Sequence, residues 1–161
     1  MRGALRRRRR ACSLQAELAV TTPNARVLVV DDEPAIRALV AKIVYRAGLP
    51  VDTACDGADA IQKMESTEYA VLVIDLMMPI VDGFGVIDYV KKMSGSRPAV
   101  IVASASDTAV LRRLDGSIVH SIVRKPFEID VLGDLIAAAA RSREAASAQS
   151  DVVVPFPRAL H

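Results

Sequence analysis

A single carboxylate ends one of the most apolar stretches of this sequence. Asp75 follows five apolar residues, 70–74, and precedes the segment 76–79, which ends in a proline. Uninterrupted apolar runs of this length are typical of strands that are buried on both faces of a parallel sheet. Asp75 would then lie at the carboxyl end of a central strand, where open α/β sheets bind their ligands. A carboxylate at that place is costly to bury unless a positive group lies beside it.

Other polar side chains follow other apolar runs in the same way. Asp31 and Asp32 come after the first run, Ser104 comes after the fourth and Lys125 comes after the fifth. Because the carboxyl ends of parallel strands meet at one edge of a sheet, we expect these side chains to converge on Asp75. Each residue alone is better explained as a turn or helix-start residue. Their occurrence at four ordered strand ends predicts a common site.

The chemistry of such a site follows from its charges. Three carboxylates, Asp31, Asp32 and Asp75, repel one another, and one ammonium group offsets only part of that repulsion. A hard divalent cation resolves the surplus, and Mg²⁺ fits because it binds one or two carboxylates, keeps several waters and accepts phosphate oxygens. Asp75 could then attack phosphorus and form an acyl phosphate. Magnesium, Lys125 and the Ser104 hydroxyl would each neutralise one phosphoryl oxygen.

The elements that must position these residues can be read from the apolar pattern. We expect strands at 26–30, 51–54, 70–74, 99–103 and 118–123. We expect helices that begin at Pro34, Gly57 and Gly83, a short helix over 108–114, and a last helix from Glu128 to near Arg141. Strands that alternate with helices imply right-handed crossovers and a parallel sheet. The predicted fold class is a single doubly wound α/β domain with helices on both faces of the sheet.

Charge divides the chain into three parts. Residues 1–10 contain six arginines and no acid, whereas residues 26–141 contain thirteen Lys or Arg and sixteen Asp or Glu. We expect a disordered basic extension over 1–25, the folded domain over 26–141 and a disordered tail over 142–161. Five consecutive arginines favour anionic partners in general, but no aromatic residue adjoins them, and we expect no specific nucleic-acid binding.

Composition also bounds the cellular context. No apolar run approaches the roughly 18 residues of a membrane span, so we expect no membrane association. The two cysteines, Cys12 and Cys55, cannot form a disulfide framework, which favours a reducing compartment such as the cytoplasm.

Three segments resemble the signature segments of a known family. Residues 27–34 contain the acidic pair, residues 75–83 run from Asp75 to Gly83, and residues 125–127 read Lys-Pro-Phe. In this order and spacing they are similar to the receiver domain of two-component response regulators, over about residues 26–141. The resemblance implies a flavodoxin-like sheet with strand order 2-1-3-4-5. It also implies a switch that is phosphorylated by a sensor histidine kinase or a phosphotransfer protein. Because the segment after Arg141 is too short for a DNA-binding or enzymatic output domain, we expect a stand-alone receiver.

The resemblance assigns roles to individual residues. It implies that Asp75 is the phosphoacceptor, and that Asp31, Asp32, Asp75 and the backbone carbonyl of Met77 surround Mg²⁺. Ser104 corresponds to the hydroxyl residue that follows the phosphoryl group, and Lys125 corresponds to the lysine that pairs with it. The bond between Lys125 and Pro126 is expected to be cis.

The sequence departs from the family pattern at several positions. Ile122 stands three residues before the lysine, where the family usually has the Tyr or Phe that turns inward on phosphorylation. Residues 108–120 are irregular and place Gly116 early, which affects the expected output face. Ile80 replaces a frequent glycine, which we interpret as tolerated loop variation. His120 has no neighbouring histidine or cysteine to complete a metal site, and we expect it at the surface.

Two alternatives stay open beside the phosphorylation switch. The first is a module of the same fold that binds its partners without phosphate, which the missing aromatic at Ile122 favours. The second is an enzyme such as a phosphatase that forms an aspartyl phosphate. Such enzymes use an Asp two residues beyond the nucleophile, whereas Met77 occupies that position here and cannot move a proton. We therefore expect no enzyme activity beyond self-catalysed phosphotransfer and slow autodephosphorylation, and an output through an unknown downstream protein.

Overall fold

A parallel sheet of five strands lies at the centre of the protein, in the spatial order β2-β1-β3-β4-β5. The computed structural model describes residues 25–150, with side chains described through residue 147. The strands are β1 (Val27–Val30), β2 (Val51–Ala54), β3 (Val71–Ile74), β4 (Ala99–Ser104) and β5 (Val119–Arg124). This is the flavodoxin-like order, so the predicted fold class is confirmed.

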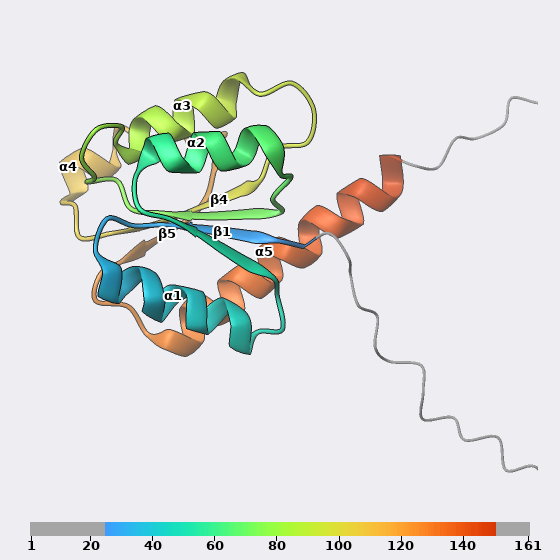
Figure 1. The fold of residues 1–161 in the computed structure, drawn as a ribbon, viewed down its shortest axis with the longest axis horizontal. Coiled ribbons are helices and arrows are strands. Elements are labelled where there is room, and N and C mark those ends of the chain that lie inside the picture. The colour runs from blue at the N-terminus through green and yellow to red at the C-terminus, as the bar shows by residue number, and fades with distance from the viewer. Residues whose placement is uncertain (1–24, 151–161) are drawn as a thin grey trace, which may run out of the picture.

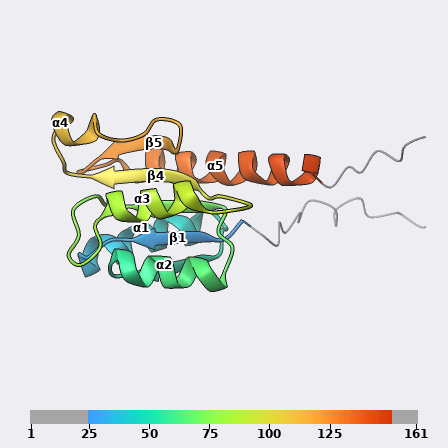
Figure 2. The ribbon, with the colours of Figure 1, turned by 90° about the horizontal axis from the view of Figure 1, so that it is seen from above.

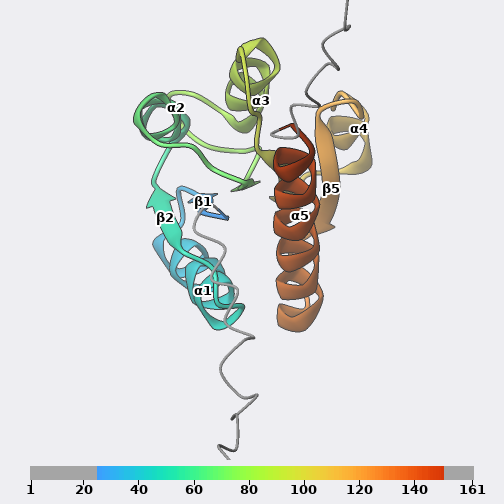
Figure 3. The ribbon, with the colours of Figure 1, turned by 90° about the vertical axis from the view of Figure 1, so that its right-hand side faces the viewer.

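Helices cover both faces of this sheet (Figure 1). They are α1 (Pro34–Arg46), α2 (Gly57–Ser66), α3 (Gly83–Lys92), α4 (Thr108–Leu111) and α5 (Ile129–Ser150). Helices α1 and α5 share one apolar core with the sheet, whereas α2 and α3 share the other. Seen from the end, α2 and α3 lie on the side opposite α1 and α5 (Figure 3).

The apolar runs explain how one sheet serves two cores. Successive side chains of a strand point to opposite faces, so Val71 and Val73 of β3 enter the α1–α5 core while Leu72 and Ile74 enter the α2–α3 core. Every residue of β1, β3 and β4 is buried, whereas the edge strand β5 alternates between half-buried and exposed positions. The central strands therefore place their carboxyl ends on a rigid, fully covered support.

The segment before β5 is irregular, as the sequence suggested. Helix α4 is a single turn that begins after Asp107, whose carboxylate accepts a hydrogen bond from the Val110 amide at 2.9 Å. The predicted continuation to Leu114 is wrong, because the chain leaves the helix for a series of turns. Asp115 closes one of them by accepting hydrogen bonds from both the amide and the hydroxyl of Ser117. The pairing of β4 with β5 also shifts register between Val100 and Ile101.

Helix α5 continues to Ser150, so the predicted end near Arg141 is wrong. Figure 2 shows that its last turns project past the sheet. The reason lies in residues 142–150, which include three alanines and contain no glycine or proline, and alanine has the highest helix propensity. The remainder of the predicted tail, 151–161, lies outside the described residues.

The predicted N-terminal extension also lies outside the described residues, except for Ala25. This residue is buried against the α1–α5 core, although it falls within the range predicted for the extension. Among residues 25–150, no helix has the length and apolar character that crossing a membrane requires.

Candidate functional site

Lys125 joins two carboxylates at the carboxyl edge of the sheet. Its Nζ lies 2.6 Å from Asp31 Oδ2 and 3.1 Å from Asp75 Oδ2, although these residues are 94 and 50 positions away in the chain. The side chains of Lys125, Asp31 and Asp75 are only 15%, 5% and 11% exposed. The structure therefore contains the predicted convergence of Asp31, Asp75 and Lys125.

The protonation of Lys125 reflects two opposing effects. Burial acts to lower its pKa, because the charged ammonium loses water. The hydrogen bonds and negative charges of Asp31 and Asp75 act in the other direction and more than compensate, so that the pKa of Lys125 lies above its ordinary value. The ammonium form is therefore held in place between the two carboxylates.

Asp31 is fixed by its neighbours at three points. Besides the contact with Lys125, its Oδ1 accepts a hydrogen bond from the Glu33 amide at 2.9 Å. Its backbone carbonyl accepts a hydrogen bond from Arg37 Nη1 at 2.6 Å. Arg37 was not identified from the sequence. The only indication there is that a cation occurs near the start of the helix that follows the acidic pair.

Asp32 completes an acidic cluster that opens to solvent. One carboxylate oxygen from each of Asp31, Asp32 and Asp75 can be chosen so that all three lie within 4.8 Å of one another. Asp32 is exposed while the other two are buried. The three carboxylates face one ammonium group, which leaves an excess of negative charge beside a set of oxygen ligands.

The loop between β3 and α3 is held closely against Asp75. The Met77 amide donates to Asp75 Oδ1 at 3.4 Å, and the Gly83 amide donates to the Leu76 carbonyl at 3.0 Å. A side chain at Gly83 would collide with the carbonyl oxygen of Asp75, so glycine is required there. The Met77 side chain is 63% exposed. The structure thus places the Met77 backbone next to the candidate phosphoacceptor.

Ile80 in the same loop carries backbone strain. Its φ is +70°, and it is the one non-glycine residue with positive φ among residues 25–150. Positive φ is unfavourable for a β-branched residue, and the exposed side chain, at 85%, gains little packing in return. The replacement of glycine at this position therefore has an energetic cost that the sequence interpretation did not include.

Ser104 lies at the end of β4 and is almost fully buried, at 1% exposure. Its Oγ lies 2.9 Å from Ser106 Oγ and accepts a longer hydrogen bond, 3.3 Å, from the Ser106 amide. In this structure the hydroxyl is thus engaged by the β4–α4 loop. Ser106 was not identified from the sequence, although a serine two residues after another is a common spacing for local hydroxyl turns.

The two remaining singled-out residues lie on the edge strand β5. Ile122 is 45% exposed, so the position of the missing aromatic points toward solvent. His120 is exposed as expected, and its Nδ1 is hydrogen-bonded with Ser121 Oγ at 2.9 Å. The bond between Lys125 and Pro126 is cis, as the resemblance implied.

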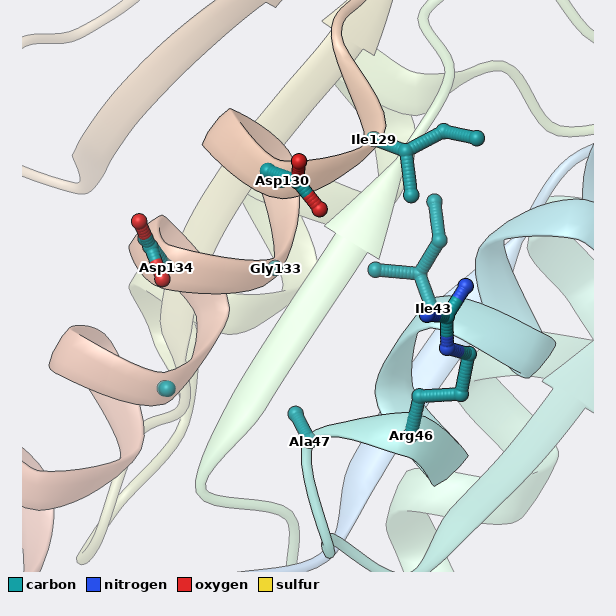
Figure 4. Close-up of a pocket in the computed structure, with 8 residues that line it drawn as sticks. Ile43, Arg46, Ala47, Ile129, Asp130, Gly133 and Asp134 are labelled. Atoms are coloured by element: carbon teal, nitrogen blue, oxygen red, sulfur yellow. The ribbon is translucent and has the colours of Figure 1, made fainter.

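A groove of about 390 Å³ lies between α1 and α5, away from the acidic cluster. Ile43 and Arg46 of α1 and the adjoining Ala47 face Ile129, Asp130, Gly133 and Asp134 of α5 across it (Figure 4). The lining combines apolar side chains with the charges of Arg46 and the two aspartates. None of the residues of the acidic cluster lines this groove.

Comparison with known proteins shows the same architecture and the same family. The response regulator receiver domain matches residues 27–137. The transcriptional regulatory protein TcrA of Mycobacterium tuberculosis is 34% identical over 110 residues, which are 68% of this chain and 43% of TcrA. The protein PilG of Pseudomonas aeruginosa is 30% identical over 109 residues, 66% of this chain and 81% of PilG. The chain thus spans less than half of TcrA.

Solved structures agree with these matches. The response regulator TrrA of Thermotoga maritima, determined in complex with Mg²⁺ and beryllium fluoride, is 30% identical with a TM-score of 0.64, over 71% of this chain and 97% of that one. The receiver domain of the Francisella response regulator 1452 is 29% identical with a TM-score of 0.65, over 74% of this chain and 98% of that one.

Proposed function

Because this chain belongs to the response regulator receiver family, we propose that it is a signalling switch whose Asp75 accepts a phosphoryl group. The observation that carries the proposal is the contact of Lys125 with both Asp31 and Asp75, beside an exposed Asp32. A structural ion pair needs one carboxylate for one ammonium. The excess of carboxylates at an open edge instead suits a site that binds a cation and a phosphoryl group.

The transfer uses a carboxylate oxygen of Asp75 as the nucleophile. That oxygen forms a bond to phosphorus while the bond from phosphorus to the donor breaks and the donor keeps its electron pair. For a phosphohistidine donor on a sensor kinase or phosphotransfer protein, the leaving group is the imidazole. Lys125 supplies positive charge next to the phosphoryl oxygens, and the Met77 amide lies close enough to Asp75 to donate to them.

The donor set of the site fits magnesium. It consists of carboxylate oxygens within 4.8 Å of one another, of which Asp32 is exposed, and such oxygens are the ligands of this hard cation. Asp31, Asp32, Asp75 and the backbone carbonyl of Met77 would hold it. When bound, it supplies charge neutralisation for the phosphoryl oxygens.

Output would pass through a partner protein that distinguishes the two phosphorylation states. The added charge at Asp75 would shift an existing equilibrium between conformations. Met77 offers no acid or base two residues after Asp75, which supports a switch with slow autodephosphorylation over a phosphatase. The cytoplasmic location stays a prediction from the sequence.

One observation favours the second candidate, a module that binds partners without phosphate. Ile122 is aliphatic and exposed, so the inward turn of an aromatic side chain is not available. A magnesium titration separates the two functions, because a degenerate site would not bind the cation at millimolar concentration.

The proposal is tested by the mass of the intact protein after incubation with acetyl phosphate, with and without magnesium. We expect the wild type to gain one phosphoryl group only with magnesium, and Asp75→Asn to gain none. Asp88→Asn, which changes an exposed acid on α3, should be labelled like the wild type. Labelling of Asp75→Asn, or no labelling of the folded wild type in magnesium, would contradict the proposal.

A further inference from the structure

Ser104 has a buried hydroxyl whose hydrogen atom needs an acceptor. The side chain is 1% exposed, and among the described residues its hydroxyl is hydrogen-bonded with the side chain and the amide of Ser106. The geometry allows either hydroxyl to donate at 2.9 Å, but the amide can only donate, so we assign Ser106 Oγ as the acceptor for the Ser104 hydrogen. Ser106 is half-buried and can direct its own hydrogen to water.

We propose that Ser106 is a positioning residue that holds the Ser104 hydroxyl in its resting orientation and so sets the cost of recruiting it to a phosphoryl group. This inference rests on the proposed function, in which Ser104 donates to a phosphoryl oxygen on Asp75. To do so, Ser104 must withdraw its hydrogen from Ser106 Oγ. The resting contact with Ser106 therefore competes directly with the phosphorylated state.

The contact between Ser104 and Ser106 also connects the site to helix α4 and strand β5. Ser106 directly precedes Asp107, which caps α4, and the first residue of α4, Thr108, accepts a hydrogen bond from Arg124 of β5 at 2.7 Å. Release of Ser106 thus acts on a single-turn helix that is tied to the edge strand. This route joins the site to β5 without an aromatic side chain at Ile122.

The test is the affinity of the full chain for beryllium fluoride in the presence of magnesium, the pair bound in the Thermotoga structure. Ser106→Ala removes the resting acceptor and leaves the hydrogen of the buried Ser104 hydroxyl without a partner, so recruitment becomes easier. We expect about fivefold tighter binding, the equivalent of one typical net hydrogen bond. Ser106→Thr keeps a hydroxyl and should restore the wild-type affinity.

A double-mutant cycle makes the test specific. Ser104→Ala should weaken binding, and in that background Ser106→Ala should have no further effect. Unchanged or weaker binding by Ser106→Ala, or an equal effect with and without Ser104, would overturn the proposal. If instead the folded wild type does not bind beryllium fluoride in magnesium at all, the proposed function itself fails.

Discussion

The amino ends and the carboxyl ends of the parallel strands, the amino edge and the carboxyl edge of the sheet, carry polar clusters that differ in charge balance. Near the amino ends of the strands, Arg26 Nη1 lies 3.2 and 3.1 Å from the two oxygens of Asp52, and the Tyr69 hydroxyl donates to the same carboxylate at 2.9 Å. The positive charge of the guanidinium balances the negative charge of the carboxylate, and the phenol is neutral. At the carboxyl edge, Lys125 faces a group of three carboxylates. The amino edge is electrostatically complete, whereas the carboxyl edge is complete only with added positive charge.

The backbone shows the same contrast. The turns at the amino edge that need positive φ use glycine, at Gly48 and Gly95, whereas the β3–α3 loop at the carboxyl edge uses Ile80. Strain of this kind persists where the surrounding structure enforces it, and it concentrates at functional sites. The comparison teaches that one end of the sheet is balanced in charge and places glycine at its positive-φ turns, while the other keeps an excess of carboxylates and a strained backbone.

The largest effect should follow from removing the cation that pairs with Asp31 and Asp75 at the carboxyl edge. Lys125→Met leaves Asp31 and Asp75 partly buried without a counter-charge, and we expect a loss of about 2 to 3 kcal/mol in the free energy of unfolding without magnesium. Magnesium should recover part of this loss. Chemical denaturation in EDTA and in magnesium measures both quantities.

The matched control is Lys92→Met, because Lys92 pairs with Asp88 on the surface, where both side chains are more than half exposed. It should cost less than about 0.5 kcal/mol in either buffer. Equal losses for the two variants would mean that the carboxyl edge is no less balanced than the surface.

The contribution of Tyr69 at the amino edge to the free energy of unfolding should depend on pH in the alkaline range. Burial, followed by the hydrogen bond and charge of Asp52, raises the pKa of Tyr69 to about 12 from its model-compound value of 10.0. Because Tyr69 ionises near pH 10 in the unfolded chain and only near pH 12 in the folded protein, the stability of the fold declines as pH rises through this interval. We expect Tyr69→Phe to be less stable than the wild type by about 2 kcal/mol at pH 8, because it removes the hydrogen bond to the Asp52 carboxylate.

Urea denaturation of both proteins from pH 8 to pH 11.5 measures this difference, which should shrink as the phenol of the wild type ionises. Other groups that titrate in this range cancel in the comparison. A difference that is independent of pH would contradict a linked ionisation of Tyr69 and would leave only lost packing or hydrogen bonding.

The smallest effect should come from relieving the strain at Ile80. Ile80→Gly removes a conformational cost of about 1 to 3 kcal/mol but makes the unfolded chain more flexible by about 0.5 to 1 kcal/mol. We expect a net gain of about 1 kcal/mol in thermal or chemical denaturation. Ile80→Ala keeps a Cβ at positive φ and should gain less, so an equal or larger gain for alanine would show that the backbone is not the cause.

The sequence alone was sufficient for the fold and for the meeting of Asp31, Asp75 and Lys125 at one edge of the sheet. Buried parallel strands need continuous apolar runs, and these runs mark β1, β3 and β4 clearly. Because parallel strands end at one edge, the positions of Asp31, Asp75 and Lys125 in the chain already implied their meeting in space. The cost of Ile80 and the length of α5 were misjudged, since neither the φ of a loop residue nor the end of an alanine-rich helix is fixed by the apolar pattern.

Only the tertiary structure decided which groups touch. The hydrogen bonds from Arg37 to the Asp31 carbonyl and between Ser104 and Ser106 depend on the angle at which a helix or loop leaves its strand, and periodicity contains no information about that angle. The same holds for the amino edge, where Arg26, Asp52 and Tyr69 belong to segments that only strand pairing brings together. Patterns of burial are local properties of the chain, whereas directional contacts between side chains are properties of the packed whole.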